Sequence, residues 1–227
     1  MNVDPRVQGW SFRKSREGSI LGFSILFSLA VIIFLVYPGL VTGIIAAIIF
    51  SLWAIVLYFF RDPERKVSGD PNIFYSPGDG VVSDITTFRE EDYLDIEFVR
   101  VGIFLSVFDV HIQRAPIEGE VDFITHQMGK NLPAFNPSAS GENAQIVMGL
   151  KTRFGPILIK QISGILARKC YNYAGIGDRL KSGQRYGLIK FGSRVELYLP
   201  DNARLLCDIG DKVKGGISGI AEMAENK

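Results

Sequence analysis

The strongest pattern in the chain is a long apolar run near its N-terminus. No charged residue occurs between Gly18 and Phe60. The dipeptide Pro38-Gly39, a strong breaker of helices, divides the run into Ser19–Tyr37 and Leu40–Phe60. Each half is close to the ~20 residues with which an α-helix crosses the hydrocarbon core of a bilayer. The pattern therefore predicts a transmembrane helical hairpin.

The charges that flank this run predict its orientation. Basic residues precede it at Arg6, Arg13, Lys14 and Arg16, and follow it at Arg61, Arg65 and Lys66. By the positive-inside rule, both ends of the hairpin then lie on the cytoplasmic side. The three basic residues after the run are expected to favour an anionic membrane surface by about 1 kcal/mol each. A cleaved signal peptide is a poorer interpretation, because the run is too long and is doubled, and a hairpin buried in a soluble core is the other alternative.

Beyond the hairpin, short β-rich segments alternate with Gly, Pro, Asn and Ser. Met128–Gln145 contains few β-branched residues and is expected to be a long loop. We expect an α+β chain with two parts: an N-terminal membrane hairpin with basic flanks at 1–66, and a mainly β soluble domain, like a sandwich or half-barrel, at 67–227. The expected strands cover Phe74–Tyr75, Val81–Ile85, Val99–Val107, Ile146–Leu150, Pro156–Ile165 and one or two segments within Tyr186–Pro200.

A short internal repeat supports this architecture. The segment Ile176–Gly183 recurs as Ile209–Gly216, with a Gly-Asp-basic-apolar-Lys element in both copies. Such turns resemble those of lipoyl- and biotinyl-carrier half-barrels, but neither copy carries a lysine flanked for cofactor attachment. We expect two related hairpins with Ser193 between them.

Composition excludes some classes of function. The chain has 227 residues, 47% of them hydrophobic, and a formal net charge of +1. Such a balance argues against nucleic-acid binding, which requires a basic excess. Two cysteines, Cys170 and Cys207, without a CxxC motif, indicate neither a disulfide framework nor a metal site.

The candidate chemistry begins at Gly192-Ser193, which interrupts a strand pattern. A serine nucleophile needs a base within hydrogen-bond reach, and the base needs a partner that orients it. The chain has only two histidines: His111 ends an apolar strand, whereas His126 precedes the long loop and fits a surface position better than a substrate contact. Asp79 and Asp109 could both orient His111, and spacing does not choose between them.

A resemblance to a known family decides between the two aspartates in favour of Asp79. The chain resembles the short form of the phosphatidylserine decarboxylase proenzymes, including the archaetidylserine decarboxylases, over essentially its whole length. The motifs that carry the resemblance are Tyr58–Pro63, Ser76–Gly80, Asp109–Pro116 and Phe191–Arg194, in that order.

The resemblance implies that the chain cuts itself between Gly192 and Ser193. Asp79 would orient His111, which would take the proton of the Ser193 hydroxyl for attack on the Gly192 carbonyl. The products would be a β chain of residues 1–192 and an α chain of residues 193–227, whose first residue becomes a pyruvoyl group.

The resemblance also implies the activity. The pyruvoyl cofactor would form a Schiff base with the serine headgroup of an anionic phospholipid and accept electrons as carbon dioxide leaves, without a metal or pyridoxal phosphate. His126, Lys130 and Glu142 would contact the substrate. The enzyme would act at the cytoplasmic face of the cell membrane as a homodimer.

Two alternatives from other classes remain. A membrane-anchored serine hydrolase would use Ser193, His111 and Asp79 on external substrates. A non-catalytic β module tethered to the membrane would use the same residues only in turns and strands. Both alternatives predict one intact polypeptide, whereas the decarboxylase predicts two.

Overall fold

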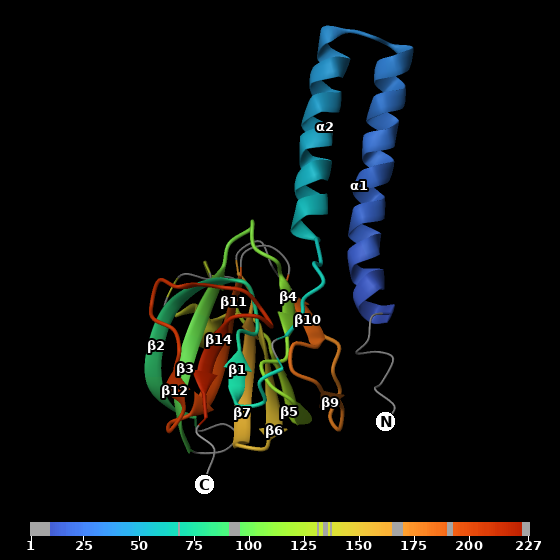
Figure 1. Ribbon diagram of the computed structural model, residues 1–227. Helices are drawn as coiled ribbons and strands as arrows, with labels where there is room; N and C mark the ends of the chain where they lie inside the picture. Colours follow the sequence, from blue (N-terminus) through green and yellow to red (C-terminus); the bar gives the residue numbers. More distant parts are fainter. Residues whose placement is uncertain are drawn as a thin grey trace.

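The computed structural model describes residues 10–67, 69–90, 96–130, 132–133, 136, 138–164, 170–189 and 193–223, and it joins a helical hairpin to a β domain (Figure 1). Helix α1 covers Trp10–Val36 and helix α2 covers Leu40–Phe59. Each contains 20 residues long and apolar enough to cross a bilayer, from Glu17 to Val36 and from Leu40 to Phe59. The predicted hairpin is confirmed, although α1 begins well before the apolar run.

The two helices contact each other through side chains within the apolar run. The indole Nε1 of Trp53 donates a hydrogen bond of 3.0 Å to Ser24 Oγ, and Phe27 stacks on Trp53 with ring centroids 5.0 Å apart. The connection is closed by Thr42, whose hydroxyl donates to the carbonyls of Tyr37 and Gly39. These contacts hold the helices side by side, as Figure 1 shows.

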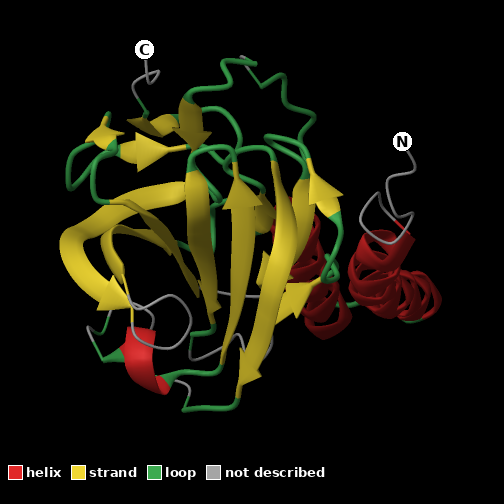
Figure 2. Ribbon diagram, turned by 90° about the horizontal axis from the view of Figure 1, so that it is seen from below, coloured by secondary structure: helices red, strands yellow, loops and turns green. Residues whose placement is uncertain are grey.

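The β domain is built on one antiparallel sheet of eight strands in the order β13-β2-β3-β11-β7-β6-β5-β9. The sheet curls around its own core (Figure 2), so the expected half-barrel is confirmed. Its strands are β2 (Gly80–Glu90), β3 (Ile96–Leu105), β5 (Gly119–Gln127), β6 (Gln145–Thr152), β7 (Gly155–Ile162), β9 (Arg179–Leu180), β11 (Ser193–Pro200) and β13 (Lys212–Val213). Two three-stranded sheets complete the domain: β1 (Ile73–Tyr75), β14 (Gly219–Glu222) and β12 (Arg204–Leu205); and β4 (Ile112–Arg114), β10 (Arg185–Ile189) and β8 (Cys170–Asn172).

Strand β11 lies between β3 and β7 in the interior of the large sheet. Because side chains alternate along a strand, one face carries Val195, Leu197 and Leu199, which are fully buried in the main hydrophobic core. The other face carries Arg194, Glu196 and Tyr198, which are also buried. A strand buried on both faces is usually apolar along its whole length. Arg194 and Glu196 depart from that pattern, and because burying a charge is costly, both need partners inside the protein.

The two copies of the internal repeat lie at opposite edges of the large sheet, with Ser193 on β11 between them as expected, but neither copy forms the expected hairpin. Each copy forms a turn followed by a two-residue strand, β9 on β5 and β13 on β2. The hydrogen bonds match: Gly177 N donates to Val121 O and Gly210 N donates to Val82 O, at 2.7 and 2.8 Å. Both glycines have positive φ, +88° and +98°, which favours glycine at these turns.

The segment expected as a long loop contains a short helix, α3 (Ala139–Glu142). One helical turn is too short to show a periodic pattern, so its Gly, Ser and Asn residues indicated only a loop. Strand β5 was not expected either, although Val121, Phe123 and Thr125 alternate along it; a bulge between Val121 and Phe123 interrupts its register with β6. The expected strands around residues 74, 81, 99, 146 and 156 are all present.

Candidate active site

Ser193 is the first residue of β11 and is fully buried. It pairs with Leu105 of β3 and lies on the same strand face as Val195. Its hydroxyl has no hydrogen-bond partner among the described residues. Gly192, the other half of the expected cleavage site, lies outside the described residues. Buried hydroxyls without a hydrogen-bond partner are uncommon in proteins, so this one suggests a chemical role for Ser193.

His111 lies between β3 and β4, and its side chain is also fully buried. Its Nδ1 is 3.0 Å from the carbonyl oxygen of Asp109. Because a carbonyl can only accept, Nδ1 carries the proton and donates it, which leaves a lone pair on Nε2. Nε2 has no partner among the described residues. His111 is thus held in the tautomer that a general base requires.

The surroundings of His111 keep it neutral. Burial lowers its pKa to about 4, against the hydrogen bond to Asp109 and the charges of Asp109 and Asp79, which raise it. The ring of Phe59, at the end of α2, lies over the imidazole with centroids 4.3 Å apart. The membrane hairpin therefore forms part of the wall around His111, and this contact crosses the expected boundary between residues 66 and 67.

Asp79 is bound by Arg65 and by the main chain. Arg65 donates from both terminal nitrogens to the two carboxylate oxygens, at 2.5 and 2.7 Å, and the Gly215 amide donates to Oδ1 at 2.8 Å. Only 5% of the Arg65 side chain is exposed. The expectation that Arg65 faces an anionic membrane surface is therefore wrong, because its charge forms an ion pair with Asp79 inside the domain.

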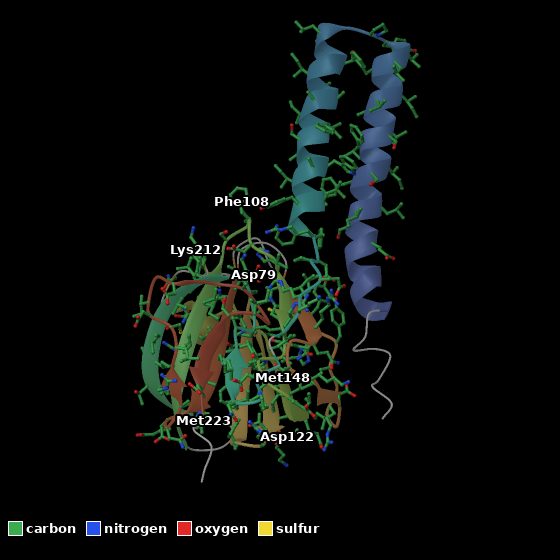
Figure 3. The ribbon with its side chains drawn as sticks, in the orientation of Figure 1. Asp79, Phe108, Asp122, Met148, Lys212 and Met223 are labelled. Carbon is green, nitrogen blue, oxygen red and sulfur yellow. The ribbon has the colours of Figure 1, made fainter. Side chains whose placement is uncertain are left out.

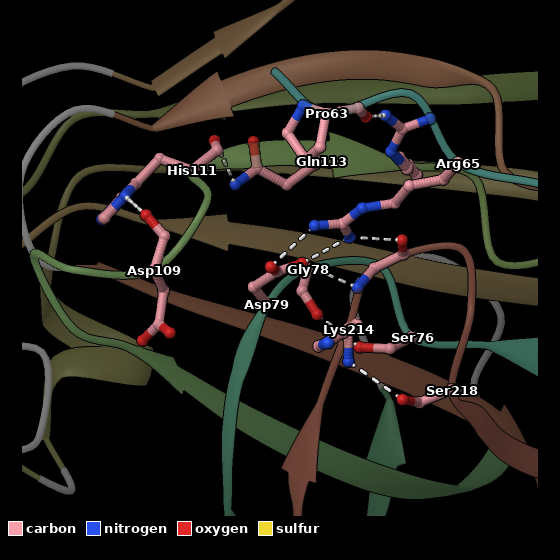
Figure 4. Close-up of polar contacts among 12 residues, drawn as sticks. Pro63, Arg65, Ser76, Gly78, Asp79, Asp109, His111, Gln113, Lys214 and Ser218 are labelled. Carbon is pink, nitrogen blue, oxygen red and sulfur yellow. Dashed lines mark hydrogen bonds and ion pairs between the residues drawn. The ribbon is translucent and has the colours of Figure 1, made fainter. Parts of the chain in front are cut away.

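Figure 4 places the two acids considered as partners of His111. The Asp109 carboxylate accepts hydrogen bonds from the amide and hydroxyl of Ser106, at 2.8 and 2.7 Å. The Asp79 carboxylate accepts from Arg65 and Gly215. Among the described residues the imidazole is bonded to the Asp109 main chain and to neither carboxylate. Asp79 acts on His111 here through its charge.

The three expected substrate contacts lie on the strand end and the loop that includes α3. His126 is exposed near the end of β5, opposite Ile146 of β6. Lys130 and Glu142 form an ion pair of 2.6 Å, with 70% and 43% of their side chains exposed. This loop meets the strand of Ser193 through Ser140, whose hydroxyl donates to Glu196 at 2.9 Å.

Directly after Ser193, Arg194 links β11 to β2 across β3 through ion pairs. Its Nε donates to Glu196 on β11 at 2.7 Å, and its terminal nitrogens reach Asp84 on β2 at 2.7 and 2.8 Å. Burial alone would lower the pKa of Arg194, but the Asp84 hydrogen bond and the Glu196 charge raise it above its usual value. The residue next to the expected cleavage site is thereby tied to Glu196 on its own strand and to Asp84 on β2.

A glycine makes the bridge possible. Strand β3 lies between β11 and β2, and Gly102 stands between Glu196 and Asp84 in the register. A Cβ on Gly102 would lie 2.2 Å from Arg194 Nη2 and 2.6 Å from Asp84 Oδ2. The missing side chain leaves the space through which Arg194 crosses β3.

Comparison with known proteins agrees with these features. Residues 52–221 match the family of phosphatidylserine decarboxylases. The chain belongs to the phosphatidylserine decarboxylase family. It is 40% identical over 203 residues to a phosphatidylserine decarboxylase proenzyme of Carboxydothermus hydrogenoformans, covering 89% of this chain and 94% of the relative. It is 42% identical over 174 residues to the proenzyme of Geotalea uraniireducens, covering 76% and 81%.

Sequence analysis missed three features of the candidate site. Arg65 was assigned to the membrane surface because it sits in a basic cluster, which says nothing of a partner distant in sequence. Phe59 lies near the end of the apolar run predicted to cross the membrane, and nothing beside it in the sequence indicates a contact with His111. For the Arg194 bridge a signal existed, because Arg194 and Glu196 alternate with apolar residues on one strand beside a candidate nucleophile. Charges in such a strand indicate buried partners.

Proposed function

We propose that this chain is a proenzyme that cuts itself between Gly192 and Ser193 and then decarboxylates a serine phospholipid. One observation carries the proposal beyond family membership. Ser193 Oγ and His111 Nε2 are both fully buried and both without a partner among the described residues. Unpaired buried polar atoms cost stability, and a nucleophile and its base are groups for which that cost has a function.

For self-cleavage, His111 is proposed as the general base. Its Nδ1 proton is engaged by Asp109 O, so Nε2 can accept the proton of the Ser193 hydroxyl. The oxygen then attacks the Gly192 carbonyl, and the peptide bond opens to an ester as the freed amine takes up the proton. Elimination separates the two chains by leaving a carboxylate on Gly192 and a dehydroalanine at position 193, which then takes up water and releases ammonia to give the pyruvoyl group. The Asp79 charge favours the imidazolium that forms, which is the role proposed for this residue in the triad.

After cleavage, the new α chain stays in place without the peptide bond. Its strand β11 pairs with β3 on one side and β7 on the other, while β13 pairs with β2 and β14 with β1. These ladders belong to the α chain of residues 193–227 and the β chain of residues 1–192. The first residue of the α chain therefore keeps its position beside Leu105.

For decarboxylation, a pyruvoyl group derived from Ser193 supplies a carbonyl that binds the substrate amine and withdraws electrons as carbon dioxide leaves. The buried start of β11 fits this group, because Ser193 Oγ has no hydrogen bond to any described residue that the conversion would break. Arg194 holds that strand end through Asp84 and Glu196. His111 is proposed to deliver the proton to the product carbon, which requires that Nε2 first takes up a proton, because burial keeps the resting imidazole neutral.

The membrane hairpin supports a lipid substrate. We propose that α1 and α2 hold the domain at the cytoplasmic face of the cell membrane, with phosphatidylserine or archaetidylserine as substrate and a homodimer as the working form. His126, Lys130 and Glu142 are proposed to contact the headgroup.

The function is tested with vesicles that contain phosphatidylserine labelled at the serine carboxyl group. We expect release of labelled carbon dioxide by the wild type and none by Ser193→Ala. The histidines give a matched pair: His111→Ala is expected to abolish self-cleavage, whereas His126→Ala leaves it intact. Cleavage in His111→Ala would overturn the proposed base. An intact wild-type chain whose Ser193 reacts with a fluorophosphonate probe would favour the serine hydrolase.

A further inference from the structure

An apolar groove of about 600 Å³ lies between the end of α2 and the turn that follows β3. It is lined by Ala54, Ile55, Tyr58, Phe59, Val107 and Phe108. Its volume is within the roughly 300–1,000 Å³ typical of small-molecule sites. A site of this size with so little polar lining is suited to a hydrocarbon ligand.

The outer wall of the groove is an exposed apolar turn. Phe108 is 67% exposed and Val107 40% exposed. Figure 3 shows Phe108 at the end of the β domain from which the helical hairpin extends. Isolated apolar residues are common on surfaces, but here two adjacent ones stand beside a membrane-length helix.

The turn is held firmly in this position. The Asp109 carboxylate accepts two hydrogen bonds from Ser106, which close the turn at its base. Arg61 donates to the Phe108 carbonyl at 2.6 Å, and its guanidinium lies 3.9 Å from the centre of the Tyr58 ring. Arg61 therefore ties the turn to the end of α2, so the groove has two fixed walls.

The position of the groove identifies its occupant. Its inner wall is the last turn of an apolar segment that ends at Phe59, so the groove continues the lipid-facing surface of α2 toward the domain. One ring forms a common wall: Phe59 lines the groove and also lies 4.3 Å from the ring of His111. A chain in the groove would thus enter from the bilayer and end next to the candidate active site.

We propose that the groove binds one hydrocarbon chain of the phospholipid substrate, and that the Val107–Phe108 tip penetrates the bilayer interface beside α2. This inference rests on the proposed function and deepens it. The groove draws the lipid part-way out of the leaflet and directs its headgroup past Phe59 toward His111. Each additional methylene buried in the groove raises affinity about fourfold.

The test compares substrates with the same headgroup and different chains. Variant Phe108→Ser removes the exposed wall without disturbing a core residue, and Ile176→Ser is the matched control, because Ile176 is 69% exposed on a turn outside the groove. The kcat/KM of the processed enzymes is measured on monomeric phosphatidylserines with six to ten carbons per chain. In the wild type and the control, kcat/KM is expected to rise with chain length. In Phe108→Ser, the gain in kcat/KM from the six-carbon to the ten-carbon substrate is expected to be at least tenfold smaller than in the wild type.

The outcomes separate this inference from the proposed function. Equal chain-length dependence in Phe108→Ser and the wild type would overturn the groove as a lipid site. So would a loss of activity in Phe108→Ser that is the same for every chain length. If light scattering in detergent shows that Phe108→Ser changes the mass of the protein, the groove is a contact between two copies, and the proposed lipid site is overturned as well. Failure of the wild type on every substrate would instead refute the proposed function.

Discussion

Replacing Gly102 with alanine tests the bridge that holds the strand of Ser193. Gly102 has no positive φ, so alanine is compatible with its backbone, and the effect comes only from contacts. The added Cβ would lie 2.2 Å from Arg194 Nη2 and 2.6 Å from Asp84 Oδ2. Because neither approach is tolerable, the guanidinium must move away and its hydrogen bonds to Asp84 must break.

The expected cost follows from those bonds. Arg194 Nη2 donates to Asp84 Oδ1 at 2.8 Å and Nη1 lies 2.7 Å from Oδ2, and hydrogen bonds to charged groups contribute about 1.5–3 kcal/mol each. Asp84 is 28% exposed, so water replaces part of what it loses. Both charges remain, which places the cost below the ~3–5 kcal/mol of removing one partner of a buried pair. We expect a loss of about 2–4 kcal/mol in the free energy of unfolding, or roughly 1–2 M in urea midpoint.

The measurement is urea denaturation in detergent, followed by far-ultraviolet circular dichroism, in a Ser193→Ala background that keeps the chain whole. Gly141→Ala is the matched control, because a Cβ there meets nothing within 4 Å. In an Arg194→Met background, Gly102→Ala should have little further effect. A Gly102→Ala variant as stable as Gly141→Ala would refute a stabilising bridge across β3.

Two further predictions concern the groups around the site. Burial lowers the pKa of His111 to about 4, whereas the unfolded chain titrates near 6.5, so the unfolded state binds the proton first as pH falls. The contribution of His111 to stability is complete above about pH 6.5 and is lost toward pH 4, about 3 kcal/mol in all, and His111→Gln should remove this part of the pH dependence in urea titrations. Equal pH dependence in both proteins would contradict the buried neutral imidazole. Arg65→Met should destabilise the domain by about 3–5 kcal/mol and slow self-cleavage, because it leaves the Asp79 carboxylate buried without its cation. The neighbouring Lys66 is exposed, so Lys66→Met should change stability by less than about 0.5 kcal/mol, and equal effects in both variants would contradict the Arg65–Asp79 pair.

Much of the fold could be predicted because it depends on local patterns of hydrophobic and polar residues in the sequence. The hairpin follows from an uncharged run broken at Pro38-Gly39, and α1 and α2 reverse at that dipeptide. The strand pattern around Tyr186–Pro200 predicted β10 and β11. Short strands such as β9 and β13 are set by pairing with distant strands, and two residues carry no periodicity of their own.

The candidate site was less predictable, because its partners come from distant parts of the chain. Ser193 and His111 stood out as chemical types, but only the fold shows that both are buried and that Ser193 Oγ and His111 Nε2 have no partner among the described residues. Nothing local indicates that Arg65 reaches Asp79, or that Phe59 covers His111. A basic residue and an aromatic residue beside a membrane helix have the same pattern whether they face lipid or protein.

Intact mass spectrometry of the purified wild-type protein tests the central claim most directly. The account predicts two chains, residues 1–192 and residues 193–227, with the second beginning in a pyruvoyl group, and a single full-length chain in Ser193→Ala. A folded wild-type protein that remains one chain of 227 residues with an ordinary serine at position 193 would contradict the account.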